Sequence, residues 1–472
     1  MPGFLLCLLV VGALAAIPAE AGQAQAAATQ EREAVAVPVR EARAELEREA
    51  DAAPVREAAA TPEREAAVAQ VREAAAEPAP VLNKELTLSL QAGGRPALLL
   101  DGSTSTKVAL AEDSSLEISC PEGTVIHGLY LVWDKPPGPW MLHSPEGEEE
   151  WGAHGFLHEY VPISGRAENL RLSWSGGGKV LCDIHVFGDG LLPEWVQTWK
   201  LPHERADILL LPTHGDDEHL FFGGTMPYYA GELGLKVQVS YLVNHWTEPY
   251  RPHEILDGLW AVGVEHYPVM GPYPDYYSGS LAHARSIYAE DEMTAYQIAL
   301  LRQFRPLVVI GHDINGEYGH GVHMLNTATL MEALEASGDP LADIPSAERY
   351  GTWDVPKAYL HLYQENHMLM DWDRPLERFG GKTAFEMAER GFSFHKSQQQ
   401  WFSVRKTGVH DCRSFGLYRS DRGADLVGGD FMEGLAPYPS APYPYDEGVL
   451  RRLYQTRYGM LGIGHYLGRG AN

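Results

Sequence analysis

The sequence is short of basic residues. Its 472 residues include 37 Lys and Arg against 64 Asp and Glu, a formal net charge of −27. A nucleic-acid partner would require clustered Lys and Arg to displace condensed counterions, and the chain has no basic stripe. The composition therefore argues against nucleic acid as a partner and favours a soluble protein that acts on neutral or cationic molecules.

Cysteine is also scarce, with four in the whole chain. Cys7 lies in an apolar N-terminal run, which leaves Cys120, Cys182 and Cys412 for the rest of the protein. Three are too few for a disulfide-framed scaffold or a Cys-based zinc site. A Cys120–Cys182 bridge and buried free thiols both remain open.

The apolar run from Phe4 to Ile17 is too short to span a bilayer comfortably. A small-x-small triplet follows at residues 19–21, as in a cleavable secretory signal, although no Lys or Arg precedes the run. We predict a signal peptide over residues 1–21, a secreted or periplasmic location, and no transmembrane segment after cleavage. An N-terminal anchor is the alternative.

Large aromatic residues are missing from the next segment. Residues 22–81 consist mainly of Ala, Glu, Arg, Val and Pro, with Arg-Glu-Ala recurring every eight residues from Arg32 to Arg72. Prolines interrupt any long helix, and nothing anchors a core. We predict a low-complexity spacer, mobile or partly helical. A coiled coil is disfavoured because an eight-residue Ala-rich repeat lacks the apolar heptad seam.

Residues 82–190 change to short apolar runs separated by Gly, Pro and Asp, such as LTLSLQ, SLEISC, HGLYLVW and LRLSW. This pattern predicts an antiparallel β-sandwich. The stretches LLDGSTSTKV, LYLVWDKPPGPW and KVLCDIHVFGDG resemble discoidin-like, or galactose-binding-like, domains, which implies a glycan ligand. Trp133, Trp140 and Trp151 either stack on sugar rings or belong to the core.

From Ala206 onward, apolar strands alternate with helical stretches. The expected strands are ADILLLPT, KVQVSYLVN, EHYPVMG and PLVVIGH, with helices near 217–231, 253–264, 291–303 and from 321. This order predicts an α/β fold with a Rossmann-like, doubly wound parallel sheet over residues 191–433, and a ligand site at the C-terminal ends of the strands. The Tyr- and Pro-rich tail, residues 434–472, has no motif that we can interpret.

Two of these strand ends carry imidazole and carboxylate groups. ADILLLPT runs directly into His214, Asp216 and Asp217. PLVVIGH is followed by His320 and His323, which are three residues apart and can share one helical face. Two His and one carboxylate with an open position form the ligand set that catalytic zinc favours. Without a metal, the same residues would be ordinary helix starts capped by Asp.

The combination resembles the PIG-L, or LmbE-like, family of zinc de-N-acetylases. The hallmark of that family is a His-Pro-Asp-Asp-Glu stretch followed later by a His-x-x-His pair. Here the first motif reads HGDDE at residues 214–218, and the second reads GEYGHGVH at residues 316–323. The Arg251-x-x-Glu254 pair and HKSQ at residues 395–398 also look like the family's. The resemblance covers about half of the chain, residues 206–433.

Carried over to this sequence, the family pattern implies a role for each residue. His214, Asp217 and His323 are the expected ligands of zinc (Zn2+), and Asp216 is the expected general base. His320 is expected to stabilise the oxyanion or to protonate the leaving amine. Asp217, three residues after His214, can face the same ion, whereas Asp216 points elsewhere and can reach the attacking water.

Arg251 is expected to hold a hydroxyl, phosphate or carboxylate of the substrate. Glu218 and His312 are expected to support the ligands through hydrogen bonds, and a helix first-turn carboxylate is the alternative for Glu218. Two positions depart from the family pattern. Gly215 replaces the usual Pro, which loosens the turn. Val322 stands where several members carry Asp, so a carboxylate beside the histidines is missing.

The expected function is zinc-dependent hydrolysis of the N-acetyl amide of an amino sugar, in an N-acetylglucosamine-type glycan or glycoconjugate, with release of acetate. Two alternatives remain: a zinc amidase that removes a larger acyl group, and an inactive glycan-binding surface protein. The sequence does not identify the sugar or the oligomeric state.

Overall fold

The computed structural model of the protein describes residues 79–439 except residue 178. The chain divides into two units, Met1–Ala75 and Ala76–Asn472, and the described residues all belong to the second. The predicted signal peptide, almost all of the predicted spacer and most of the C-terminal tail lie outside the described residues, so those predictions stand as they are.

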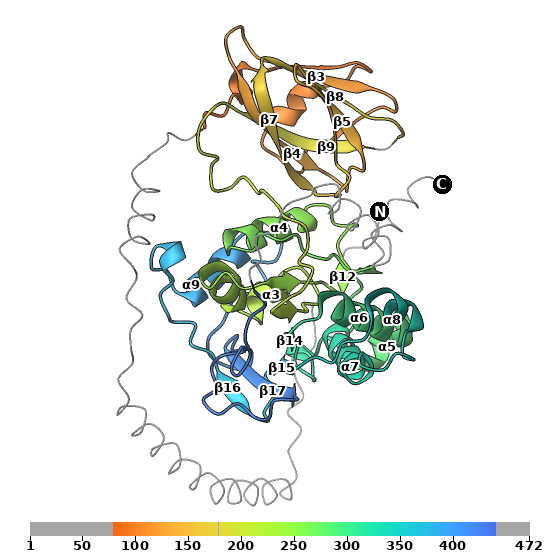
Figure 1. Ribbon diagram of the computed structural model, residues 1–472, viewed down its shortest axis with the longest axis vertical. Helices are drawn as coiled ribbons and strands as arrows, with labels where there is room; N and C mark the ends of the chain where they lie inside the picture. Colours follow the sequence, from red (N-terminus) through yellow and green to blue (C-terminus); the bar gives the residue numbers. More distant parts are fainter. Residues whose placement is uncertain (1–78, 178, 440–472) are drawn as a thin grey trace, which may run out of the picture. The chain divides into compact units, whose positions relative to one another are not determined.

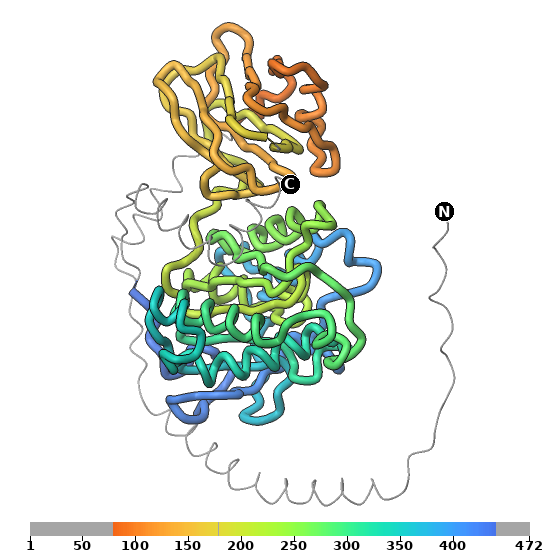
Figure 2. The backbone as a smooth tube through the Cα atoms, turned by 90° about the vertical axis from the view of Figure 1, so that its right-hand side faces the viewer, coloured from red at the N-terminus to blue at the C-terminus, as the bar shows by residue number. Residues whose placement is uncertain are grey.

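Two antiparallel sheets form the first part of the described chain. Their strand orders are β1-β3-β8-β5-β6 and β2-β9-β4-β7. Figure 2 traces this part in orange to yellow as mostly extended segments joined by turns. The strands are β1 (Thr87–Leu90), β2 (Val108–Ala109), β3 (Ser115–Ser119), β4 (Ile126–Trp133), β5 (Trp140–Ser144), β6 (Gly147–Trp151), β7 (His158–Ala167), β8 (Asn169–Ser173) and β9 (Val180–Phe187). The predicted β-sandwich is confirmed.

The sandwich core holds one buried carboxylate. Trp133 and Trp140 are 0% and 1% exposed, and their indole N–H groups donate to Oε2 of Glu159 over 3.2 and 3.0 Å. The backbone N–H of Gly152 donates to the other carboxylate oxygen over 2.8 Å. Trp133 and Trp140 therefore belong to the core and offer no face on which a sugar ring could stack.

The cysteines of the described chain are free thiols. Cys120 is half-buried, and Cys182 and Cys412 are fully buried. Of the two states left open by the sequence, the structure shows free thiols and no Cys120–Cys182 bridge.

A six-stranded sheet forms the second part, in the order β11-β10-β14-β15-β17-β16. Its strands are β10 (Ile208–Leu210), β11 (Val237–Val239), β14 (Val308–Gly311), β15 (Lys357–His361), β16 (His367–Leu369) and β17 (Ser414–Ser420). The first four in spatial order are parallel, and β17 is antiparallel to β15 and β16. The chain runs from β10 to β11 on one side and returns to β14 on the other. The C-terminal ends of β10 and β14 therefore form the switch point where doubly wound sheets bind ligands.

Both faces of this sheet are covered. Ile208 and Leu210 belong to one apolar core together with residues of α3 and α4, whereas Leu209 and Leu211 belong to another together with residues of α6 and α7. This alternation follows from the two-residue period of a strand. The α-helices, labelled in Figure 1, are α3 (Asp217–Leu220), α4 (Arg251–Ala261), α5 (Leu281–Ile287), α6 (Glu290–Phe304), α7 (Gly321–Ala336), α8 (Ile344–Tyr350) and α9 (Ala384–Phe392). Each stretch where the sequence predicted a helix contains one, but the stretch 217–231 holds only the short α3 and most of a π-helix, Met226–Glu232.

One predicted strand forms only in part. The run EHYPVMG, residues 265–271, forms no continuous ladder, but His266 and Val269 make isolated parallel bridges. The N–H of Val269 donates to the carbonyl of Val239 in β11 over 3.0 Å. Pro268 and Pro272 have no N–H to donate to a ladder. Beyond β14 the sheet continues with β15, β17 and β16, which the sequence pattern did not reveal. None of the described helices is both long and apolar enough to cross a membrane.

Candidate metal centre

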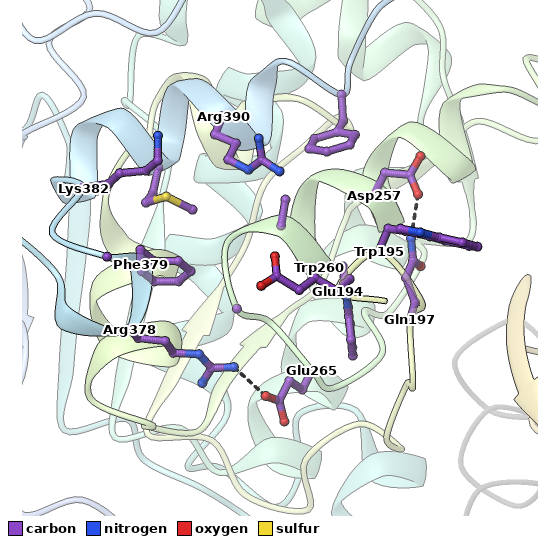
Figure 3. Close-up of a pocket in the computed structure, with 15 residues that line it drawn as sticks. Glu194, Trp195, Gln197, Asp257, Trp260, Glu265, Arg378, Phe379, Lys382 and Arg390 are labelled. Atoms are coloured by element: carbon purple, nitrogen blue, oxygen red, sulfur yellow. Dashed lines mark hydrogen bonds and ion pairs between the residues drawn. The ribbon is translucent and has the colours of Figure 1, made fainter. Parts of the chain in front are cut away.

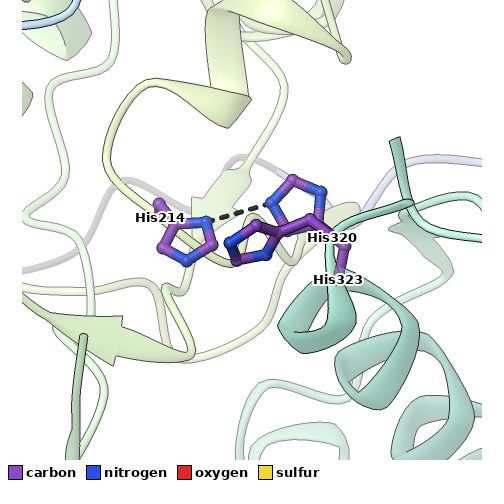
Figure 4. Close-up of side chains that lie close together, drawn as sticks. All are labelled: His214, His320 and His323. Carbon is purple, nitrogen blue, oxygen red and sulfur yellow. Dashed lines mark hydrogen bonds between the residues drawn. The ribbon is translucent and has the colours of Figure 1, made fainter. Parts of the chain in front are cut away.

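Three predicted ligands converge where β10 and β14 end. Nδ1 of His214 lies 3.0 Å from Nε2 of His323 and 3.2 Å from Oδ2 of Asp217, and the Asp217–His323 distance is 3.3 Å. Figure 4 shows the rings of His214 and His323 facing each other, with His320 beside them. Donor atoms around a tetrahedral ion with bonds of about 2.1 Å are separated by about 3.4 Å. The three side chains therefore fit a single small metal ion.

Neighbouring residues set the protonation of two of the three donors, His323 and Asp217. Nδ1 of His323 lies 2.7 Å from Oε2 of Glu317, so Nδ1 carries the proton and Nε2 is free to bind. Asp217 is 1% exposed. Burial alone would raise its pKa, but His323 and His214 hold that pKa well below its ordinary value. The carboxylate is therefore ionised, as a ligand must be.

Glu317 corrects the expectation drawn from Val322. Val322 packs in the apolar core, and the carboxylate expected at that position is supplied by Glu317, five residues earlier. Glu317 is fully buried and also accepts from Nδ1 of His312 over 2.8 Å and from Nδ1 of His361 over 2.7 Å. Burial opposes ionisation, but His312 and the hydrogen bonds from the three imidazoles lower the pKa of Glu317 well below its ordinary value.

The three histidines around Glu317 differ in their second ring nitrogen. Nε2 of His312 accepts the backbone N–H of Thr213 over 2.9 Å, so this ring is neutral with its proton on Nδ1. Nε2 of His361 lies 3.1 Å from the backbone carbonyl oxygen of Asp411. Both partners of His361 are hydrogen-bond acceptors, so its ring is held on two sides.

A second carboxylate lies on the other side of His214. Oδ1 of Asp275 is 3.5 Å from Nε2 of His214, and Oδ2 is 3.3 Å from Nδ1 of His245. Asp275 therefore attracts the proton of His214 to Nε2 and leaves Nδ1 for the ion. Neither Asp275 nor Glu317 was singled out from the sequence. Asp275 sits in an irregular stretch more than fifty residues after the first motif, and Glu317 was noticed only as part of the second.

The predicted base, Asp216, lines the cavity beside Arg251. Asp216 lies 3.6 Å from the guanidinium of Arg251, which also donates to the carbonyl of Gly215 over 2.6 Å. Burial and the charge of Asp217 raise the pKa of Asp216 well above its ordinary value, and Arg251 opposes this. A carboxylate with a raised pKa has the proton affinity that a general base needs.

His320 lies next to the ligands. Its ring centroid is 4.9 Å from that of His214 and 4.7 Å from that of His323, and its donor atom falls within 4.8 Å of theirs. Burial, reinforced by His214 and His323, lowers the pKa of His320 to about 3. The ring is therefore neutral near pH 7 and can donate one hydrogen bond to a bound group.

Glu218 and His312 support the site in different places. Nε2 of His312 lies 3.5 Å from Oδ2 of Asp217. Oε2 of Glu218 accepts the backbone N–H of Asp216 over 2.8 Å, so Glu218 holds the backbone of the predicted base.

Gly215 is explained by its surroundings. A Cβ at this position would lie 2.2 Å from Cδ1 of Ile255, and its backbone N–H donates to Nε2 of His245 over 3.0 Å. Proline has no N–H, and its ring would collide with Ile255. The departure from the family pattern is thus matched by neighbouring residues of this chain.

The predicted residues open onto a cavity of about 390 Å³. His214, Asp216, Arg251, Asp275 and His320 line it together with polar and aromatic side chains, among them Tyr318 and Gln398. Tyr318 has a left-handed backbone, with φ of 47°. A non-glycine residue in that region is strained, and such residues cluster at functional sites.

A larger cavity, about 780 Å³, lies between the outer face of α4 and residues 378–394 (Figure 3). Its lining includes Trp260, Arg378 and Phe379 but none of the predicted ligands or the predicted base. The larger cavity is therefore not the candidate active site. The smaller cavity is, because His214, Asp216 and His320 line it.

The geometry and the strand order define a class: a doubly wound α/β protein in which two histidines and one carboxylate converge at the switch point as a candidate metal centre. No family model matches the chain. The chain is, however, similar in sequence to proteins named 1D-myo-inositol 2-acetamido-2-deoxy-alpha-D-glucopyranoside deacetylase. It is 26% identical to one from Catenulispora acidiphila over 40% of this chain and 65% of that protein. It is 33% identical to one from Saccharopolyspora erythraea over 32% of this chain and 63% of that protein.

These similarities agree with the resemblance found in the motifs. The matched region spans less than two thirds of the length of those relatives.

Two solved structures show weaker likenesses. The N,N'-diacetylchitobiose deacetylase from Pyrococcus horikoshii has a TM-score of 0.32 and 17% identity, over 42% of this chain and 72% of that chain. The family 32 carbohydrate-binding module of NanJ from C. perfringens has a TM-score of 0.19 and 14% identity, over 23% and 98%. At TM-scores this low, the fold assignment rests on the strand order and not on these likenesses.

Proposed function

We propose that the protein hydrolyses the N-acetyl amide of an amino sugar and releases acetate, using a zinc ion held by His214, Asp217 and His323. The observation that carries this proposal is the triangle of three donor atoms, 3.0 to 3.3 Å apart, beside a cavity lined by Asp216. Two imidazoles and a carboxylate with an open side are the donors that suit catalytic zinc. When bound there, zinc polarises an amide carbonyl and makes a water molecule acidic at neutral pH.

Asp216 is placed to take a proton from the attacking water. It lines the cavity, its raised pKa gives it proton affinity, and Arg251 and the backbone contact from Glu218 hold it in place. As the carbon–nitrogen bond breaks, the same carboxyl group can give that proton to the leaving nitrogen, so that it departs as a neutral amine.

His320 and Arg251 act on the substrate. His320 is neutral and lines the cavity, so its N–H can donate to the oxygen on which negative charge develops. Arg251 also lines the cavity, and its charge can hold a hydroxyl group or an anionic group of the substrate.

An amino sugar suits the polar wall of the cavity. Asp275, Glu248 and Gln398 line it together with Arg251, which provides both hydrogen-bond acceptors and donors for hydroxyl groups. The relatives named above are deacetylases of an acetamido sugar linked to inositol. Both points support an N-acetyl amino sugar over a larger acyl amide.

The test is acetate release combined with a metal assay. The purified chain, its zinc content measured, is incubated with N-acetylglucosamine, N,N'-diacetylchitobiose and an N-acetylglucosaminyl inositol, and free acetate and free amine are quantified. The proposal expects equal amounts of both products and loss of activity after removal of zinc. Activity only on amides with longer acyl chains would identify an amidase, and an inactive zinc-loaded protein would favour the glycan-binding alternative.

We also propose that the protein acts outside the cytoplasm. The apolar run Phe4–Ile17 and the small-x-small triplet after it support export. Sequencing the N-terminus of the protein recovered from expressing cells tests this, because cleavage after residue 21 is expected and an uncleaved Met1 contradicts it.

A further inference from the structure

A second group of metal-binding side chains lies outside the active-site cavity. Glu218 and His219 belong to α3, and His395 follows α9, and all three are 0% exposed. Oε1 of Glu218 lies 3.0 Å from Nε2 of His395 and 3.5 Å from Nε2 of His219. The three donor atoms lie within 4.8 Å of one another.

These atoms lack the hydrogen bonds that buried polar groups normally make. Within residues 79–439, neither ring nitrogen of His219 has a hydrogen-bond partner, and Nε2 of His395 and Oε1 of Glu218, although 3.0 Å apart, are not aligned for a hydrogen bond. Buried polar groups are almost always satisfied, so several unsatisfied atoms in one place indicate a missing group.

Space for such a group is kept open by a glycine of α4. A Cβ on Gly258 would lie 2.8 Å from Nε2 of His219 and 3.1 Å from Nε2 of His395. The position that a Cβ of residue 258 would occupy therefore lies close to both nitrogens. Only glycine at residue 258 leaves this position empty. Gly391 of α9 also leaves space for the ring of His219, because a Cβ at position 391 would lie 2.2 Å from Cε1 of that ring.

The donor set suits a divalent transition metal. Separations of 3.0 and 3.5 Å bracket the value of about 3.4 Å expected around a tetrahedral ion with bonds of about 2.1 Å. Two imidazoles and one carboxylate are donors that ions of the zinc class accept.

We infer that Glu218, His219 and His395 form a second metal site, separate from the site of His214, Asp217 and His323, that takes a divalent ion of the zinc class. None of its three side chains lines the active-site cavity, so the ion would be structural and would not meet substrate. Its effect reaches the active site through Glu218, whose other oxygen accepts the backbone N–H of Asp216. The ion would join α3 to the segment after α9 behind the predicted base.

Counting ions tests this inference. The purified full chain is saturated with zinc, dialysed, and analysed for zinc per chain, and a crystal is examined for anomalous scattering at the zinc edge. The wild-type protein is expected to hold about two ions, and Asp217→Ala and His395→Gln about one each. Gly258→Ala keeps all ligands but fills the space in front of the two nitrogens, so it too should hold about one. Gly338→Ala is the matched control, because its Cβ meets nothing closer than 3.8 Å, and should hold about two.

The results separate this inference from the proposed function. A wild-type protein with one ion that Asp217→Ala removes would overturn the second site and leave the first intact, with the cluster holding water. Two ions retained in a folded His395→Gln variant would also overturn it. An anomalous peak at Glu218 would support it even in a protein that releases no acetate. If Gly258→Ala does not fold, as shown by circular dichroism, the His395→Gln count and the anomalous map decide.

Discussion

Glu317 stands directly behind His323, with Oε2 2.7 Å from the Nδ1 atom of that ligand. A carboxylate in this position fixes the ring and raises its basicity toward the ion. Glu317→Gln should therefore weaken zinc binding by about 10- to 100-fold. Competition with a zinc-sensitive dye gives the affinity. Glu335→Gln, at an exposed carboxylate, is the control and should bind like the wild-type protein. Equal affinities for the two variants would show that Glu317 does not tune the ligand.

Asp216 and Asp217 are adjacent, but their substitution should have different effects on zinc content and turnover. Asp216→Asn should keep the ion at the first site and lose turnover by about a hundredfold or more, since it removes a base and no ligand. Asp217→Ala should lose the ion, and activity should return only with excess zinc. His323→Ala should behave like Asp217→Ala, and His320→Ala like the Asp216 variant. Zinc content and initial rates decide, and a reversal between the two Asp variants would exchange their roles.

Gly215 should not tolerate the proline that is usual in the family. Gly215→Pro collides with Ile255 and removes the N–H that bonds to His245, so we expect a loss of stability of about 3 kcal/mol or more. Adding Ile255→Ala should relieve the collision but not the lost hydrogen bond. Thermal melts of the single and double variants measure this. If the second change restores no stability to the first, the collision is not the reason for glycine.

Asp275 should matter for rate more than for metal content. Its pKa is held well below the ordinary value by His214 and His245, against the effect of burial, so it is ionised and attracts the proton of His214. Asp275→Asn keeps an acceptor and removes the charge. We expect near-normal zinc content and a rate about tenfold lower. An unchanged rate would mean that the contact to His214 has no effect on catalysis.

The buried carboxyl group of Glu159 should make the free energy of unfolding depend on pH. Its pKa is raised from 4.5 to about 7, chiefly by burial. Between these values the folded sandwich keeps a proton that the unfolded chain releases, so stability is fully present below about pH 4.5 and falls as pH rises toward 7. The loss is about 3 kcal/mol. Urea unfolding followed by Trp fluorescence, which reports on Trp133 and Trp140, measures it. Glu159→Gln should flatten this dependence, whereas exposed Glu122→Gln should leave it unchanged.

The sequence predicted the strands before each motif because β10 and β14 lie in short apolar runs that end before Pro212 and His312. It predicted the ligand set because motifs at adjacent strand ends must meet. It could not reveal Asp275, since pairing of that residue with His214 depends on how an irregular segment folds back. Residues 265–271 have the apolar pattern of a strand but form only isolated bridges, because Pro268 has no N–H to donate to a ladder.

Glu317 accepts from Nδ1 of three imidazoles, and these come from different elements. His312 follows β14, His323 belongs to α7 and His361 ends β15, so one carboxylate joins three elements behind the candidate metal centre. The ring of His323 is therefore held in place by the fold itself, with or without an ion. An arriving ion would spend little free energy on ordering this ligand, which is the thermodynamic advantage of a preorganised site.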